Sequence, residues 1–142
     1  MNKRMEWAFL IGRVILGVIM MAHGFQKIIG MEQTIAMFDQ IGLPPVFAYA
    51  ASIIEAVAGL TVLIGFYVVP SSILLALTMA AAIVLVKFKM GLIGGYEFPL
   101  ALLGLSVMLS LTGSRKWSLR ALMNEQTKES DASNTQIKYK KA

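Results

Sequence analysis

The sequence of 142 residues contains no cysteine, a single histidine and few charged residues. Without cysteine the chain can form no disulfide, no iron–sulfur cluster and no thiolate zinc site. A single imidazole cannot supply two axial histidines to a haem, and it leaves too few nitrogen ligands for another metal centre. These absences exclude a redox enzyme that builds its own metal site from these ligands.

The low charge also argues against a water-soluble protein. Charged residues make up 15% of the chain and hydrophobic residues 57%, which is too apolar for a soluble surface. The net charge of +5 does not indicate a nucleic-acid-binding protein, because the basic residues flank apolar runs and form no patch interleaved with aromatics. The chain also lacks a Gly-rich phosphate loop, a nucleophile elbow and a nucleotide-binding fingerprint.

Four apolar runs indicate membrane spans, since a hydrocarbon core of about 30 Å needs about 20 helical residues. The predicted spans are residues 7–29, 46–66, 70–88 and 97–113. Gly65 and Pro70 separate the second span from the third, so these two should form a tight antiparallel hairpin with Pro70 at the first helical position. The start of the fourth span near Glu97 leaves open whether residues 90–97 dip into the membrane. We predict an all-α fold, a four-transmembrane-helix bundle.

Two further segments lie outside the spans. Ile35, Phe38 and Ile41 recur at helical spacing, which predicts a short interfacial helix between spans 1 and 2. Residues 123–142 are polar and lack apolar periodicity, which predicts a disordered cytoplasmic tail after a membrane domain of residues 1–122.

The orientation follows from the lysines and arginines near the spans. Both ends of the chain carry more of them than the connections, with Lys3, Arg4, Arg115, Lys116 and Arg120 set against Lys27, Lys87 and Lys89. We therefore predict a multi-pass protein of the cell membrane with its N- and C-termini in the cytoplasm.

Small and ionisable residues share one face on each of the first two spans. This pattern is typical of close helix packing in lipid with polar groups turned inward, since a charge inside a span costs at least about 2.5 kcal/mol. The two stripes are Arg13, Gly17, Met20, Gly24 and Lys27 with His23 beside them, and Ala48, Ser52, Glu55 and Gly59.

The ionisable members of these stripes are the candidate site residues. Counting depth along two antiparallel helices predicts that Glu55 lies between the levels of His23 and Arg13, where it could pair with either. One interpretation is that the cluster only locks the two helices together; the other is that it forms a polar pocket or proton path. We predict His23 and Glu55 as catalytic residues, and Arg13, Lys27 and Glu97 as the substrate or quinone pocket. Glu97 either joins this cluster or begins the fourth helix at the interface.

The same residues occur in motifs that resemble the DoxX family of small membrane proteins. The motifs are Arg13-Val14-Ile15-Leu16-Gly17, His23-Gly24-Phe25-Gln26-Lys27, Gly42-Leu43-Pro44, Glu55 with Gly59, Leu63-Ile64-Gly65, Gly95-Tyr96-Glu97, and Gly113 with Trp117-Ser118-Leu119. Their order and spacing, over residues 11–119, make the resemblance specific. It implies a four-helix membrane bundle, usually described as an oxidoreductase, with some relatives associated with quinone-linked redox enzymes or with catechol and quinone stress. Arg120 departs from the family pattern, in which an acidic residue often stands there.

Three functions are compatible with these observations. The first is a component of a quinone-linked membrane oxidoreductase system or of a quinone and catechol stress response, in which Arg13, His23 and Lys27 donate to quinone oxygens. The second is a non-catalytic assembly subunit, and the third is a small proton-coupled transporter, against which the chain shows no internal repeat. We expect that this chain builds no cofactor site of its own, and quinone is the candidate for a bound cofactor. The candidate partners are the lipid bilayer, a redox partner protein and a second copy of the chain, with no nucleic acid.

Overall fold

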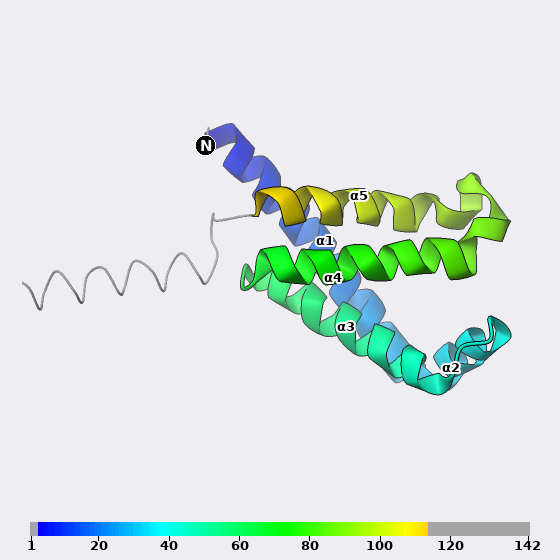
Figure 1. Ribbon diagram of the computed structural model, residues 1–142. Coiled ribbons are helices and arrows are strands. Elements are labelled where there is room, and N and C mark those ends of the chain that lie inside the picture. The colour runs from blue at the N-terminus through cyan, green and yellow to red at the C-terminus, as the bar shows by residue number, and fades with distance from the viewer. Residues whose placement is uncertain (1–2, 114–142) are drawn as a thin grey trace, which may run out of the picture.

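A computed structural model describes residues 3–113, and every regular element in that range is helical. The elements are α1 (Lys3–Ile29), α2 (Met31–Gln40), α3 (Pro45–Ile64), α4 (Val68–Ala81), η1 (Ala82–Lys87), η2 (Phe88–Met90), η3 (Leu92–Tyr96) and α5 (Glu97–Thr112) (Figure 1). The predicted tail at residues 123–142 lies outside the described residues.

Within residues 3–113, four helical stretches are long and apolar enough to cross a membrane. They are Lys3–Ile29, Pro45–Ile64, Val68–Met90 and Leu92–Thr112. The short helix α2 connects the first of these stretches to the second. The predicted fold class, an all-α bundle of four spans with a short helix between spans 1 and 2, is therefore confirmed.

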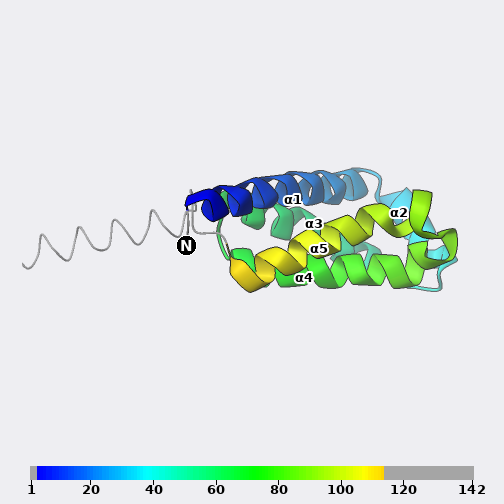
Figure 2. The same cartoon turned by 90° about the horizontal axis from the view of Figure 1, so that it is seen from above.

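The long helices pack mainly as two pairs, α1 along α3 and α4 along α5, and the α3–α4 hairpin joins the pairs. Figure 2 shows α2 and the α4–α5 connection at one end of the bundle, and the N-terminus at the other. We refer to the former as the α2 end. The antiparallel arrangement brings the last turns of α1 beside the first half of α3.

Small residues let the backbones of α1 and α3 approach closely. A Cβ atom added at Gly17 would lie 2.8 Å from Cα of Leu63, and one added at Gly24 would overlap the backbone of Ala56. Apolar side chains gain little by leaving lipid for the protein interior, so close van der Waals packing of this kind is what holds membrane helices together. Both predicted stripes are buried in this interface, apart from Lys27 and His23, which are partly exposed.

The α3–α4 hairpin turns through two residues in the left-handed conformation. Gly65 ends α3 with a φ of 76°, and Tyr67 precedes α4 with a φ of 48°. The sequence predicted Pro70 at the first helical position. The helix α4 instead begins at Val68, so Pro70 lies inside its first turn. This difference has little energetic effect, because the amide groups of a first helical turn have no intrahelical partner.

The helical path between α4 and α5 is irregular. The α-helical hydrogen bonding of α4 gives way to the wider π-helical turn of η1. The backbone then leaves the helical conformation at Gly91 (φ 82°, ψ 178°), and again at Ile93 (φ −78°, ψ 123°) and Gly94 (φ 74°, ψ 0°). Such π-helical turns occur often at functional sites, and η1 forms part of the pocket described below.

The outer surface of the bundle is apolar and part of its interior is polar. Ile53, Leu77 and Leu111 are among many exposed large hydrophobic residues, whereas Ser52 and Glu55 are almost completely buried. A soluble protein seldom exposes contiguous apolar surface on this scale. The distribution therefore indicates that the surroundings of the four spans are the lipid bilayer.

Candidate functional site

A pocket of about 440 Å³ lies in the α2 half of the bundle. Its walls come from α1, α2, α3, α5 and the α4–η1 segment, and most of the lining side chains are apolar. The polar or ionisable side chains that line it are His23, Lys27, Glu55, Thr78 and Lys87. Pockets for small organic ligands commonly have this size and this combination of apolar walls with a few polar groups.

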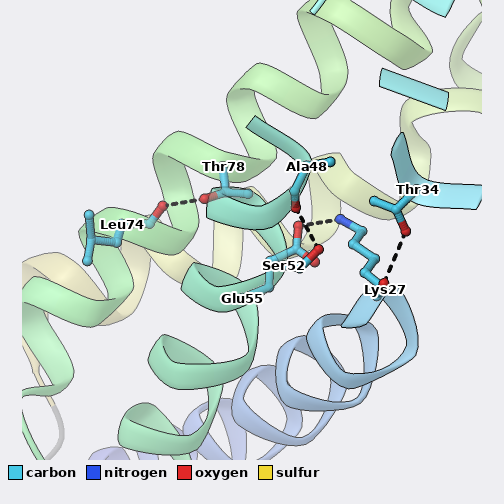
Figure 3. A network of polar contacts seen from close by, with 7 residues as sticks. All are labelled: Lys27, Thr34, Ala48, Ser52, Glu55, Leu74 and Thr78. Atoms are coloured by element: carbon cyan, nitrogen blue, oxygen red, sulfur yellow. Dashed lines mark hydrogen bonds and ion pairs between the residues drawn. The ribbon is translucent and has the colours of Figure 1, made fainter. Parts of the chain in front are cut away.

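An ion pair between α1 and α3 forms the polar part of the pocket. Lys27 Nζ donates to Glu55 Oε1 at 2.6 Å. Figure 3 shows Lys27 reaching from the end of α1 to the carboxylate on α3. The side chain of Glu55 is 1% exposed and that of Lys27 is 26% exposed, so the pair is open to the surroundings only from its cationic side.

The partner of Glu55 differs from the two that the sequence suggested. Gly24 packs against Ala56 and Gly17 against Leu63, and the same register brings Glu55 to the level of Phe25. Arg13 is then about 18 Å away along the helix axis, at 1.5 Å per residue. Glu55 therefore does not lie between the levels of His23 and Arg13, and the long side chain of Lys27, two residues beyond Phe25, supplies the cation.

The position of α3 explains this shift. In the observed register the first turns of α3 extend beyond the end of α1, where they pack against α2. The depth predicted from the sequence assumed that the outer ends of the two spans lie at the same level. It therefore placed Glu55 too deep, by about five residues or roughly 7.5 Å.

The second oxygen of the Glu55 carboxylate has no partner among the described residues. Oε2 is buried and accepts no hydrogen bond from residues 3–113. Because Glu55 lines the pocket, this buried acceptor lies in or behind the pocket wall. Buried polar atoms without a partner are few in folded proteins, and each is a candidate ligand contact.

His23 lines the same pocket from α1. Its ring centroid lies 5.5 Å from that of Phe98 on α5, with the ring planes tilted by 44°. No described residue makes a hydrogen bond with its side chain, so both ring nitrogens remain available to a ligand. His23, Lys27 and Glu55 are therefore brought together, as three of the five predicted site residues.

Arg13 and Glu97 do not line this pocket. Arg13 is 2% exposed and lies in the half of α1 away from the α2 end. Glu97 is exposed, and its Oε1 accepts a hydrogen bond of 2.9 Å from the backbone N–H of Gly94. Of the two alternatives for Glu97, the structure supports the one in which it begins the fourth helix, because the buried face of α5 is a different one, formed by Pro99, Leu102, Ser106 and Leu109.

The sequence did not identify α2, Thr78, Lys87 or Phe98 as parts of the site. Met37 and Phe38 of α2, together with Ile41 directly after it, line the pocket at one end. Thr34 fastens α2 to α1, since its Oγ1 lies 3.2 Å from the carbonyl oxygen of Lys27 and 3.1 Å from that of Gly30. Thr34 is only 5% exposed, and its position in the sequence alone did not indicate this burial.

Within the part of the chain that the structure describes, no three His, Asp or Glu residues lie close enough to hold a metal ion. The chemistry of the pocket therefore depends on one imidazole, one ion pair and the hydrogen-bonding groups beside them.

Comparisons with known proteins bear on this region of the chain. The family model DoxX matches residues 8–88, which include all five polar residues of the pocket. A protein of Bacillus subtilis (strain 168), named "Putative oxidoreductase CatD", is 44% identical over 115 residues, which cover 81% of this chain and 86% of the relative. No solved structure matches the chain.

Proposed function

Because this chain belongs to the DoxX family of membrane proteins, we propose that it is a component of a quinone-linked membrane oxidoreductase system. The observation that carries the proposal is the pocket of about 440 Å³ with mostly apolar walls. His23 and the Lys27–Glu55 pair are the polar groups that α1 and α3 contribute to it. The name of the relative from Bacillus subtilis supports the redox part of the proposal.

The pocket has the properties that a quinone ring requires. Such a ring is flat and apolar with polar oxygens at its edge, so its site needs apolar walls and a few well-placed hydrogen-bonding groups. Phe98 lies beside His23 and offers an aromatic surface for the ring to pack against. Lys27 Nζ and a ring N–H of His23 are the donors that can bind the quinone oxygens.

His23 is proposed as the proton carrier of the reaction. Reduction of a quinone to a quinol consumes two electrons and two protons, and histidine is the side chain that most readily exchanges a proton near neutral pH. Lys27 and Glu55 position the ring. A redox partner protein supplies or accepts the electrons, since the chain carries no nucleotide or flavin fingerprint.

We further propose that the protein resides in the cell membrane with both termini in the cytoplasm, as the distribution of lysine and arginine favours. In this orientation the α2 end, and with it the pocket, faces the outer side of the membrane.

Binding of a short-chain quinone to the detergent-purified protein tests the proposal. We expect His23→Ala and Lys27→Met to weaken binding at least tenfold, because each removes a donor to the quinone oxygens. Glu97→Gln is the matched control and should bind as the wild type does. If both pocket variants insert normally and bind quinone as tightly as the wild type, the proposed site is wrong.

One observation favours a second function, that of a non-catalytic assembly subunit. The Lys27–Glu55 pair joins α1 to α3, and buried ion pairs can serve only to fix how helices pack. The variant Ala51→Phe separates the two functions, because Ala51 lines the pocket and a phenylalanine there fills it. A quinone-binding component loses quinone binding and redox activity in this variant, whereas an assembly subunit keeps its partner complex and its function.

A further inference from the structure

Glu55 Oε2 is a pocket group that binding of a quinone does not use. Its neighbour Oε1 accepts from Lys27 Nζ at 2.6 Å, so the carboxylate is one half of an ion pair. A charged carboxylate oxygen only accepts hydrogen bonds. Oε2 is buried and accepts none from residues 3–113, so it lacks a donor.

The nearby hydroxyl groups of the protein are already committed. Ser52 Oγ donates to the carbonyl oxygen of Ala48 at 2.7 Å, and Thr78 Oγ1 donates to that of Leu74 at 2.9 Å. Figure 3 shows both hydroxyls turned to the backbone of their own helices. The pocket therefore offers an acceptor that the side chains around it do not satisfy.

A quinone cannot satisfy this acceptor. Its ring oxygens are carbonyl groups, which only accept, so one placed against Oε2 would bring two acceptors together. A quinol or another aromatic diol carries the same ring with O–H groups that donate. A cationic donor is less suitable, because Lys27 and Lys87 already line the pocket with only Glu55 to balance them.

We propose that the pocket preferentially binds the reduced, hydroxyl-bearing form of an aromatic ring, with one O–H donating to Glu55 Oε2. This inference rests on the proposed function for the binding of the ring, and it adds the redox form and the atom that recognises it. The expected preference is at least tenfold, since hydrogen bonds to charged groups are among the stronger ones. For a two-electron couple, a tenfold preference for the reduced form raises the potential of the bound couple by about 30 mV.

Three ligands that share one ring and one tail test the inference on the full-length, detergent-purified protein. They are a decyl-substituted benzoquinol, the matching quinone and the matching dimethyl ether of the quinol, with affinities measured without oxygen. We expect the quinol to bind at least tenfold more tightly than the other two. In Glu55→Gln the amide can donate to a carbonyl group, so the preference for the quinol should disappear.

The outcomes distinguish the inference from the proposed function. If the quinone or the dimethyl ether binds as tightly as the quinol, Oε2 does not recognise a hydroxyl group and the inference is overturned, while the pocket remains a ring site. If none of the three ligands binds, both the inference and the proposed function fail. If folded Glu55→Gln keeps the full preference, the hydroxyl group binds elsewhere and the inference is again overturned. The ligand series on the wild type stays decisive even where the variant does not fold.

Discussion

Lys27 and Glu55 are 28 residues apart in the sequence and lie 2.6 Å apart in the structure, measured from Nζ to Oε1. The pair is asymmetric, because the carboxylate is 1% exposed whereas the lysine side chain is 26% exposed. A lysine at the end of a membrane helix can extend its charged group toward water, but a carboxylate inside the helix interface cannot. The two partners should therefore differ in what their loss costs.

Removal of the lysine should be the more harmful change. Lys27→Met leaves a buried carboxylate without its cation, and we expect a loss of about 3 kcal/mol in the free energy of unfolding. Glu55→Gln leaves a lysine that can still turn outward and an amide that can still accept its hydrogen bond, so we expect a loss of about 1 kcal/mol. Unfolding by sodium dodecyl sulfate, followed by circular dichroism, measures both. Equal losses would contradict the asymmetry.

The close approach of α1 and α3 predicts a sharp difference between glycines. Gly24→Ala and Gly59→Ala each place a methyl group against the backbone of the facing helix, and we expect each to lower the free energy of unfolding by about 2 kcal/mol. Gly104 on α5 has no atom within 4 Å of an added Cβ, so Gly104→Ala is the matched control. It should stabilise the helix by about 0.5 kcal/mol. A neutral Gly24→Ala would mean that the two helices pack less closely than the structure has them.

The attachment of α2 should depend on one hydroxyl group. Thr34→Val removes the group that contacts the carbonyl oxygens at the end of α1, and we expect α2 to open more readily by about 1 kcal/mol. Amide hydrogen exchange of α2 measures this change, and faster exchange should be confined to α2. Thr112→Val removes an exposed hydroxyl that bonds only to its own helix, so exchange in α2 should not change in that control.

The absence of cysteine allows a direct test of orientation, because a single introduced thiol is then the only one in the chain. Gln33→Cys lies on the exposed side of α2, and Lys3→Cys lies at the start of α1. With both termini in the cytoplasm, a membrane-impermeant maleimide should label the first in intact cells and the second only after the membrane is opened. Labelling in the reverse order would show the opposite orientation.

Hydropathy and helical periodicity were sufficient to predict the fold class. The apolar runs predict the four spans. The small residues on one face of span 1 and of span 2 predict the interface between these two spans. Both patterns depend only on the local sequence. The partner of Glu55 could not be predicted in the same way. It depends on how far α3 extends beyond α1, which follows from the packing of Gly24 against Ala56 and of Gly17 against Leu63, and hydropathy alone does not give this register.

The role of Glu97 illustrates a second limit. The sequence left open whether Glu97 joins the cluster of the first two spans. The kink at Ile93 and Gly94 sets which face of α5 meets the bundle, and Glu97 is outside that face. The backbone conformation of a connection therefore decided the environment of a charged side chain. Lys87 was missed for a related reason, because its position depends on the π-helical turn of η1.

The π-helical turn at Ala82–Lys87 has a consequence for how this membrane protein can diverge. A π turn accommodates about one residue more than the α-helical path around it, so deletion of a single residue there would restore an ordinary α-helix. Every following side chain would then rotate by about 100° relative to α4, and Lys87 would leave the wall of the pocket. An insertion or deletion at this point would thus change ligand selectivity in one step, while the α1–α3 interface and the four crossings stayed intact.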